Sequence, residues 1–445
     1  MPKHVRAQLI KLTKHHGFVR YFKNTAWLLL EKVLRIVVGL LVGVWIARYL
    51  GSEQFGTYSY VMSLVGMFAA VATLGLDAVV VRKLVFAREK HEHLVGTAFA
   101  LKLVAAACLY LLLVAYSVFA APREAKELLL IMGAVVFFHA FYVMDFYFQS
   151  IVKSRSVVFA STLALLSASA VRVCFILMNA PLVWFGWAFL LEVMMFAAGL
   201  LYFYSANRRS IRQWVFEKNI AIDLLKASLP LVLTAFSASV YMKIDQIMLL
   251  EMVGANDVGQ YAAAVRLSEA FYFIPIAITG SVFPAILRAK EIDVELYRKR
   301  LKNLYSLVVW IAIAVALPVT FLSDSIIGSL YGAEYASASS VLVIHIWAGV
   351  FFFLNAAFVK FLYSESYEKK YLYRSVFGAA MNIGLNFVLI PSYGIQGAAF
   401  ATLLSLAAMN YLYDVLDRDL RKHLNMKVSC FDPRALLTVF QRRDR

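Results

Sequence analysis

Twelve long apolar segments separated by short loops run through this 445-residue chain and constrain its fold more than any other feature. Each segment reaches the roughly 20 residues that a helix needs to cross a bilayer at about 1.5 Å per residue. Charged residues make up only 16% of the chain, against about 25% in soluble domains. The sequence therefore predicts an all-α integral membrane protein with twelve transmembrane helices. The expected spans are 25–48, 54–75, 94–120, 127–149, 157–178, 182–204, 224–250, 258–285, 303–323, 338–362, 372–391 and 394–414.

The basic residues are distributed unevenly between the loops. Of the 44 Lys and Arg residues, the odd-numbered loops hold only Arg48, Arg123 and Lys126. Short loops rich in Lys and Arg stay in the cytoplasm, so we expect both termini and the even-numbered loops to be cytoplasmic. The net charge of +17 then lies beside anionic lipid head groups and does not indicate nucleic-acid binding.

The chain also contains an internal repeat. Residues 51–58 read Gly-x4-Gly-x-Tyr, and residues 254–261 repeat this pattern 203 positions later. A second similarity links residues 186–189 to residues 397–400. Six spans return the chain to the same side, so the repeats would form two parallel six-helix bundles. A pseudo-two-fold axis along the membrane normal would relate them, with a site between them. We expect an N-lobe of residues 1–215 and a C-lobe of residues 216–445, which ends in a basic cytoplasmic tail.

Ionisable residues inside the spans are the candidate site residues, because each costs about 2.5 to 3.5 kcal/mol at a helix centre in lipid. Side chains near the cytoplasmic ends can reach water and are expected to be solvated; these are Lys32, Lys102, Asp145 and Lys360. The remaining cations are candidates for substrate binding: Arg266, Lys243, Arg172 and Arg35. The remaining acids are candidates for ion coupling: Glu269, Asp245, Glu192 and Glu31.

In the first span, Glu31 and Arg35 are separated by four residues and share one helix face, which predicts an ion pair. A structural pair and a substrate contact remain equal alternatives for it. Gly39 and Gly43 follow on the same helix, and their Gly-x3-Gly spacing predicts close packing against another helix.

In the second half, four charged residues lie on two neighbouring antiparallel spans. Lys243 and Asp245 precede the loop at Gly254, and Arg266 and Glu269 follow it. We expect these four side chains to form one compact buried set that either lines a cavity or pairs structurally. The first half supplies two counterparts, Arg172 and Glu192.

Mixed cations and carboxylates suit a ligand that carries phosphate and sugar groups. A buried carboxylic acid can also exchange a proton and couple transport to an ion gradient. The chain lacks a Walker loop, a dinucleotide fingerprint and a His-Glu-x-x-His motif, so neither an enzyme nor a cofactor is expected. Asp417 and Asp419 resemble the acidic pair of metal-dependent glycosyltransferases, but they lie in a charged extension. The three cysteines have no zinc-binding spacing, and no metal is expected.

Several segments resemble the polysaccharide transporter family. The most specific motif covers residues 258–269, including Ala264-Val265-Arg266-Leu267, with residues 244–249, 273–275 and 283–286 around it. Looser matches are residues 50–51, 55–58, 74–76 with Arg82, 389–391, 393–395 and 397–399. The resemblance implies the V-shaped fold of the multidrug/oligosaccharidyl-lipid/polysaccharide exporter superfamily, in which two six-helix bundles rock about a central cavity.

The resemblance also implies a function. An O-antigen-type flippase would move an oligosaccharide on undecaprenyl diphosphate from the cytoplasmic to the outer face of a bacterial inner membrane. Arg266 would contact the diphosphate or acidic sugars, and membrane lipid, a polysaccharide polymerase and a chain-length regulator are candidate partners. A cation-coupled drug or metabolite antiporter is the alternative. A polymerase or ligase is less favoured, because the longest outer loop, residues 324–337, contains only two ionisable groups.

Overall fold

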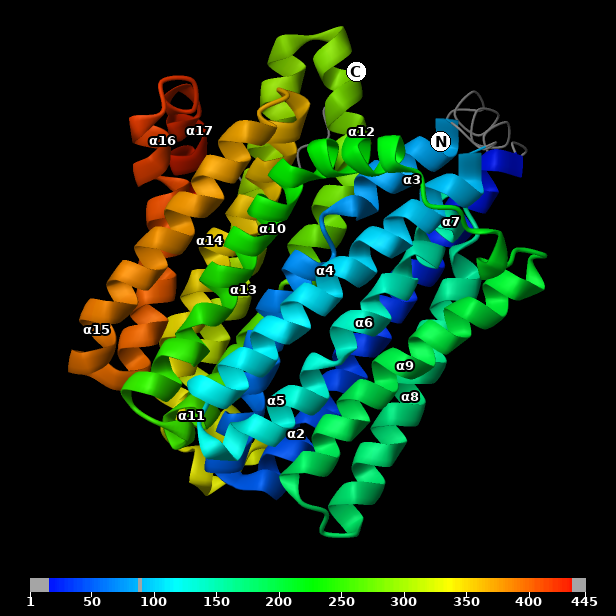
Figure 1. The fold of residues 1–445 in the computed structure, drawn as a ribbon. Helices are drawn as coiled ribbons and strands as arrows, with labels where there is room; N and C mark the ends of the chain where they lie inside the picture. Colours follow the sequence, from blue (N-terminus) through cyan, green and yellow to red (C-terminus); the bar gives the residue numbers. More distant parts are fainter. Residues whose placement is uncertain (1–15, 87–89, 434–445) are drawn as a thin grey trace. The chain divides into compact units, whose positions relative to one another are not determined.

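The computed structural model describes residues 16–86 and 90–433, and these residues form helices and connecting turns without a β-strand (Figure 1). The all-helical prediction is therefore confirmed for the described part of the chain. The α-helices are α2 (His16–Ala72), α3 (Leu76–Phe86), α4 (His91–Phe119), α5 (Arg123–Gly133), α6 (Val135–His139), α7 (Val143–Ser150), α8 (Ser154–Leu177), α9 (Leu182–Ala206), α10 (Lys218–Met252), α11 (Ala255–Glu269), α12 (Phe273–Ile292), α13 (Val294–Leu330), α14 (Ala338–Ser364), α15 (Glu368–Asn410), α16 (Leu412–Leu416) and α17 (Leu424–Ser429). Short 3-10 turns are η2 (Ala140–Tyr142), η3 (Ile211–Gln213), η4 (Ala333–Tyr335) and η5 (Arg421–His423).

Ten helical stretches of the described residues are long and apolar enough to cross a membrane. The two longest are Ala26–Phe86, with 61 residues, and Glu368–Leu416, with 49 residues. At about 1.5 Å per residue, each exceeds by far the thickness of a ~30 Å hydrocarbon core. Part of the expected basic tail, residues 434–445, lies outside the described residues.

Helix α2 is a hairpin that reverses at Gly51. Gly51 has φ 71° and ψ 171°, a conformation that breaks the helix and favours glycine. The Arg266 guanidinium fills the space beside Gly43, and its Nη2 also lies 4.0 Å from the Met62 sulfur. In a straight helix Gly43 and Met62 would be about 28 Å apart, so the chain must fold back between them.

Helix α15 reverses in the same way at Gly394, which has φ 55° and ψ −132°. The side-chain amide of Asn382 donates a hydrogen bond to Ser405 at 3.5 Å, although 23 residues separate them. A straight helix would place these residues about 35 Å apart. Two of the ten apolar stretches are therefore helical hairpins.

The repeated Gly-x4-Gly-x-Tyr segments have matching backbones. Gly254, the counterpart of Gly51, also has a positive φ, and the ψ angles of the two residues are 173° and 171°. Each glycine is followed by a helix, residues 52–72 after Gly51 and α11 after Gly254. The internal repeat thus extends from sequence to local conformation.

The two repeated segments also pack against one another through reciprocal contacts. A Cβ added at Gly56 would overlap the carbonyl of Ala255, and a Cβ at Gly259 would overlap the carbonyl of Ser52. Ser52 and Gly56 are the repeat counterparts of Ala255 and Gly259. Reciprocal contacts of this kind are the mark of a two-fold relation. Only glycine allows the backbones to approach so closely.

A second pair of contacts obeys the same relation. Arg266 occupies the space beside Gly43, and the hydroxyl of Ser63 donates to Gln246 Oε1 at 2.8 Å. Gly43 and Gln246 are repeat counterparts, as are Ser63 and Arg266. A local two-fold therefore relates the hairpins of residues 43–67 and 246–270. The expected pseudo-two-fold between complete six-helix bundles stays a prediction.

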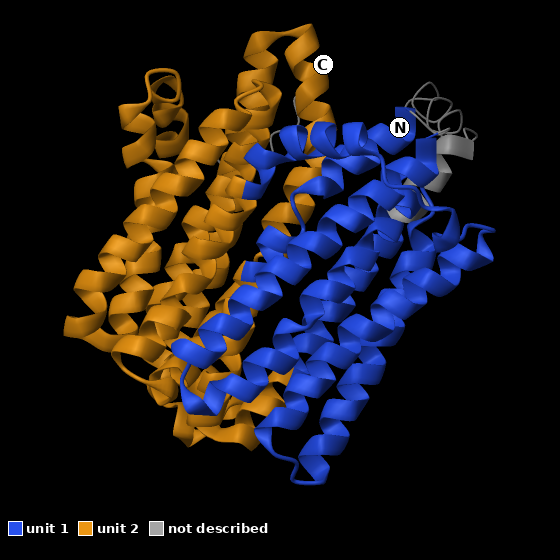
Figure 2. Ribbon diagram, in the orientation of Figure 1, with its two compact units in different colours: residues 1–42, 68–232 blue, residues 43–67, 233–445 orange. Residues whose placement is uncertain are grey.

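Contacts divide the chain into two compact units (Figure 2). Unit 1 consists of Met1–Val42 and Phe68–Val232, and unit 2 consists of Gly43–Met67 and Leu233–Arg445. One core of unit 1 joins α3 and α4 to the start of α10, where Leu224 is buried. The largest core of unit 2 joins α12, α13 and α14 around Tyr305 and Phe358. The division into lobes at residue 215 stays a prediction.

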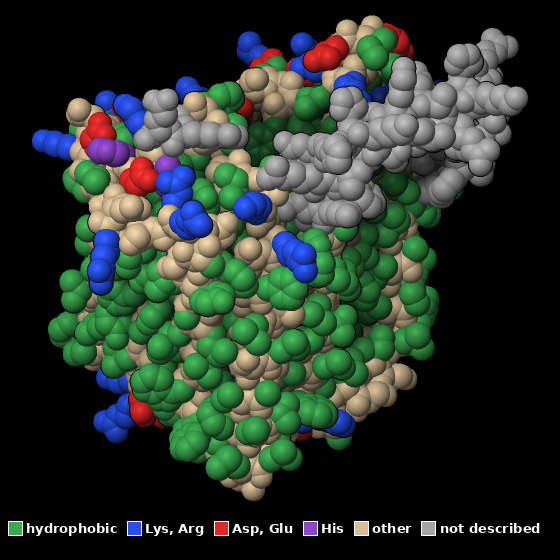
Figure 3. All heavy atoms as spheres, turned by 90° about the vertical axis from the view of Figure 1, so that its right-hand side faces the viewer, with side chains coloured by type: hydrophobic (Ala, Val, Ile, Leu, Met, Phe, Trp, Pro, Cys, Tyr) green, Lys and Arg blue, Asp and Glu red, His purple; other side chains and the backbone are tan. Residues whose placement is uncertain are grey.

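Large hydrophobic side chains are exposed on many of the apolar helices. Figure 3 shows a face whose middle is covered by hydrophobic side chains, with Lys and Arg gathered toward its two ends. The most exposed examples include Leu111 on α4, Leu163 on α8 and Phe321 on α13. This pattern is expected for a surface whose middle contacts lipid and whose ends contact the head groups.

Candidate functional site

Arg35 is the centre of a polar network in unit 1. Its Nε lies 2.9 Å from Glu31 Oε1, so the predicted pair within one helix is confirmed. Its Nη1 lies 3.0 Å from Glu192 Oε1 on α9, and its Nη2 donates to the Ser161 hydroxyl on α8 at 2.6 Å. The Ser161 hydroxyl in turn donates to Glu31 at 2.6 Å. Three helices thus converge on one guanidinium.

Arg172 joins this network through Glu192. Its Nη2 lies 2.9 Å from Glu192 Oε2, so the structure brings these two candidate residues together. The carboxylate of Glu192 therefore bridges two guanidinium groups, one from α2 and one from α8. Small residues on α8 and α9 allow the approach: a Cβ at Gly199 would lie 2.7 Å from Ala160.

A cavity of about 660 Å³ opens beside this network within unit 1. Four of its lining side chains are ionisable, namely Glu31, Lys32, Arg35 and Asp145. Lys32 is exposed and makes no ion pair with any described residue, whereas Asp145 accepts a hydrogen bond from Gln149 at 2.8 Å. The remaining lining residues are Leu28, Val81, Gln149, Val152, Ser154, Val157, Val158, Ser161 and Phe196. The cavity combines cations, carboxylates and hydroxyls with apolar walls.

Lys102 is a residue whose environment the sequence did not reveal. Its side chain is only 2% exposed, so the expectation that it reaches water is wrong. The ammonium lies 3.8 Å from Asp77 and 4.7 Å from the centre of the Phe146 ring. The helices α3 and α7 cover it, and a position near the end of a span does not predict such a cover.

The four charged residues expected to form one set in unit 2 are separated into three environments. Lys243 pairs with Glu269, with 3.3 Å between Nζ and Oε2. Asp245 and Arg266 form no ion pair with one another, so the four residues are not joined by ion pairs into one set. The reason is that other side chains on the packed helices compete for each group.

Arg266 lies against apolar groups. Its guanidinium is 5.5 Å from the centre of the Phe55 ring, and it fills the space that glycine leaves at position 43. No carboxylate among the described residues pairs with it. Gly39 has no neighbouring atom within 4 Å, so the predicted Gly-x3-Gly packing surface is wrong. The space beside Gly43 is filled by the side chain of Arg266 rather than by the backbone of a closely packed helix.

Asp245 is buried among neutral hydrogen-bond donors. It accepts from the Tyr261 hydroxyl at 2.6 Å, from the Thr402 hydroxyl at 2.5 Å and from the Asn386 amide at 2.9 Å. The side-chain amide of Asn386 also donates to Asn382 Oδ1 at 3.1 Å. The side-chain oxygen of Asn386, Oδ1, is buried without a hydrogen bond. No cationic side chain of the described chain pairs with Asp245.

This arrangement gathers oxygen atoms from α10, α11 and both legs of α15. Carboxylate, amide and hydroxyl oxygens are ligands for hard cations, and a carboxylate without a cationic neighbour can alternatively hold a proton. The described residues contain no cluster of three His, Cys, Asp or Glu side chains that would suit a transition metal. The carboxylate and hydroxyl oxygens around Asp245 suit a small hard cation, and the carboxylate can alternatively hold a proton. Its neutral members were missed because single Asn or Thr residues in an apolar span give no distinct signal.

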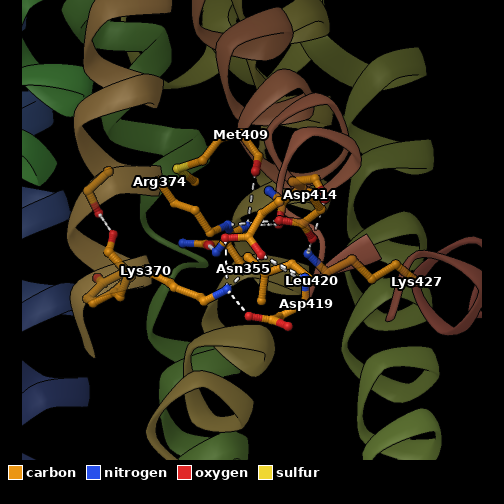
Figure 4. A network of polar contacts seen from close by, with 12 residues as sticks. Asn355, Lys370, Arg374, Met409, Asp414, Asp419, Leu420 and Lys427 are labelled. Carbon is orange, nitrogen blue, oxygen red and sulfur yellow. Dashed lines mark hydrogen bonds and ion pairs between the residues drawn. The ribbon is translucent and has the colours of Figure 1, made fainter. Parts of the chain in front are cut away.

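A second buried network ties the C-terminal helices α16 and α17 to α15 within unit 2 (Figure 4). Arg374, Asp414 and Lys427 are all fully buried, with Arg374 Nε 3.1 Å from Asp414 and Lys427 Nζ bonded to the other carboxylate oxygen. Both cations also lie over the ring of Phe358. Burial lowers the pKa of Lys427 well below its usual value. The single carboxylate of Asp414 therefore pairs with the positive charges of both Arg374 and Lys427.

The ammonium group of Lys370 lies between the two carboxylates of the acidic pair, Asp417 and Asp419. Lys370 Nζ lies 2.7 Å from Asp417 and 2.7 Å from Asp419 (Figure 4). In this arrangement the two carboxylates hold the turn after α16 against α15. Their contacts are those of a structural ion pair.

Comparison with known proteins identifies a family and several relatives by sequence similarity. The model of a family described as polysaccharide biosynthesis protein matches residues 21–290. Over 383 residues the chain is 23% identical to a probable low-salt glycan biosynthesis flippase, Agl15, of Haloferax volcanii, a match that covers 82% of this chain and 77% of the relative. It is 25% identical over 197 residues to a membrane protein of Methanocaldococcus jannaschii, which covers 42% of this chain and only 44% of the relative's length.

Solved structures share the fold. An inward-facing multidrug resistance MATE family transporter of the MOP superfamily matches with a TM-score of 0.74 and 17% identity, covering 87% of this chain and 96% of that chain. The lipid II flippase MurJ in an inward closed conformation matches with a TM-score of 0.70 and 16% identity, covering 94% and 92%. A drug transporter and a lipid flippase share this fold, so the fold alone does not select the substrate.

Proposed function

Because the chain belongs to the polysaccharide biosynthesis protein family of the MOP transporter superfamily, we propose that it is a flippase for lipid-linked oligosaccharides. The single observation that carries this proposal is the Arg35 network beside a cavity in unit 1 that combines charged and polar groups with apolar walls. Moving a sugar diphosphate through about 30 Å of hydrocarbon is prohibitive without polar shelter. Guanidinium groups match phosphate oxygens, and carboxylates and hydroxyls match sugar hydroxyls.

The substrate of this flippase is a repeat unit of O-antigen or another surface polysaccharide on undecaprenyl diphosphate. The protein moves it from the cytoplasmic to the outer face of a bacterial inner membrane by alternating access, while the polyprenyl tail stays in lipid. The two hairpins, counted with the other apolar stretches, support twelve crossings, which would place both termini on the same side. The basic loops predict that this side is the cytoplasm. A polysaccharide polymerase and a chain-length regulator would act on the exported unit.

Replacement of Arg35 with alanine is expected to reduce surface glycan at least about tenfold, because hydrogen bonds to charged groups contribute roughly 1.5 to 3 kcal/mol each. Arg266→Ala is expected to have a similar effect, because no described carboxylate neutralises that cation. Surface glycan is measured against the amount of protein in the membrane. Arg123→Ala, at the exposed first residue of α5, is the matched control and should leave the glycan unchanged. Normal glycan in the Arg35 variant, or drug efflux without a glycan defect, would favour the antiporter.

Asp245 is the proposed coupling residue, since its oxygen cluster has no cationic side chain. Asp245→Asn is expected to remove the stimulation of transport by an imposed sodium or proton gradient in proteoliposomes, because an amide cannot ionise. Asp324→Asn, which changes an exposed acid at the end of unit 2's α13, serves as the control. Equal transport by the native protein with and without either gradient would refute coupling.

A further inference from the structure

The carboxylate of Glu192 binds two guanidinium groups at once. One of its oxygens lies 3.0 Å from Arg35 and the other 2.9 Å from Arg172, so both are bound to guanidinium groups. The three groups come from α2, α8 and α9, which meet inside unit 1. A bridging carboxylate between two guanidiniums has the same contacts that one phosphate group would make.

The charges of the network balance without any ligand. Arg35 and Arg172 carry two positive charges, and Glu31 and Glu192 carry two negative charges. Burial favours such a balance because an uncompensated charge is costly in a low-dielectric site. A diphosphate that entered with both carboxylates in place would meet no net positive charge from these four groups. Its binding to these arginines therefore requires a carboxylate to leave them.

Glu192 is better placed than Glu31 to be the group that leaves. Glu31 is anchored twice, by Arg35 Nε from the same helix and by the Ser161 hydroxyl. Among the described residues, Glu192 forms ion pairs with the two arginines alone, and it comes from a different helix than either. The side chains of Arg35, Glu31 and Ser161 line the cavity, so a ligand in the cavity reaches the guanidinium that Glu192 holds.

We propose that Glu192 is a built-in competitor of the substrate's diphosphate for Arg35 and Arg172. In the empty site its carboxylate occupies the two guanidiniums. An arriving diphosphate displaces it, and the return of Glu192 to the arginines helps to release the head group on the other side. This inference rests on the proposed function and assigns to Glu192 a part in weakening the hold on the head group so that it can be released.

Glu192→Gln is expected to bind farnesyl diphosphate about tenfold more tightly than the native protein and to export glycan more slowly. Binding is measured by calorimetry on purified protein in detergent, with inorganic pyrophosphate as a second probe. An amide of the same shape no longer competes as an anion for the two arginines. A purely structural role for Glu192 predicts the opposite, namely weaker binding together with a lower melting temperature.

Two further variants keep the test decisive. Glu217→Gln removes another acid of unit 1, which lies 3.2 Å from His93, and should change neither affinity nor export. If Glu192→Gln does not fold, Glu192→Asp keeps the charge but shortens the reach, and a smaller gain in affinity is expected. Unchanged or weaker binding in the folded Glu192 variant, with Arg35→Ala still abolishing binding, overturns the competitor while the flippase stands. Absence of binding to the native protein overturns the competitor and the head-group site together.

Discussion

Gly259→Ala is expected to abolish glycan export and to lower the melting temperature of the protein, although it adds a single methyl group. The new Cβ would overlap the backbone carbonyl of Ser52, which has no rotamer that would move it away. Overpacking usually costs about 1 to 3 kcal/mol, and a clash between two backbones lies at the upper end. The hairpins of residues 43–67 and 246–270 would have to separate.

The local two-fold makes this prediction testable twice. Gly56→Ala should have a comparable effect, because its Cβ would overlap the carbonyl of Ala255. Gly39→Ala provides the control on the same α2 helix, since no atom lies within 4 Å of its added Cβ. Thermal melting in detergent and surface glycan are measured for all three. Native behaviour of the Gly259 variant would show that the hairpins do not need this close approach.

Asp414→Asn is expected to have the largest effect on folding, because it leaves Arg374 and Lys427 buried without a carboxylate. Removing one partner of a buried ion pair costs about 3 to 5 kcal/mol. The yield of monodisperse protein after gel filtration and the melting temperature should both fall. Asp417→Asn, whose pairing with Lys370 lies nearer the surface, should cost about 1 kcal/mol or less.

A double variant distinguishes the loss of charge compensation from a general loss of stability caused by the substitution at position 414. Asp414→Asn with Lys427→Met removes one of the two stranded cations and should recover part of the melting temperature. A single Asp414→Asn variant as stable as the native protein would mean that the neutral neighbours Asn355 and Asn410 are sufficient.

The sequence predicted those parts of the site that depend on local geometry. Glu31 and Arg35 meet because residues four apart share a helix face, and helix spacing makes such a pair predictable. Arg172 and Glu192 were singled out because each is costly to bury in lipid, and the structure pairs them, although the sequence had not predicted that pair. The roles of these residues in transport stay predictions.

Other parts depend on how distant helices pack, which helix periodicity does not specify. Arg266 lies against Phe55 and Gly43 because a hairpin from the start of the chain covers it, and depth along a span does not reveal that cover. Asn386 and Thr402 reach Asp245 only because α15 reverses at Gly394. Neutral polar residues become informative once the helices that bring them together are known.

The paired hairpins also bear on how a duplicated scaffold acquires direction. Ser63 and Arg266 occupy equivalent positions, and so do Gln246 and Gly43, yet one crossing holds an amide and a hydroxyl while the other holds a guanidinium. Divergence at these positions suffices to make two ancestrally equal slots electrically different. If the proposed anionic cargo reaches these hairpins, Arg266 of one copy would attract it, whereas Ser63 of the other copy carries no charge.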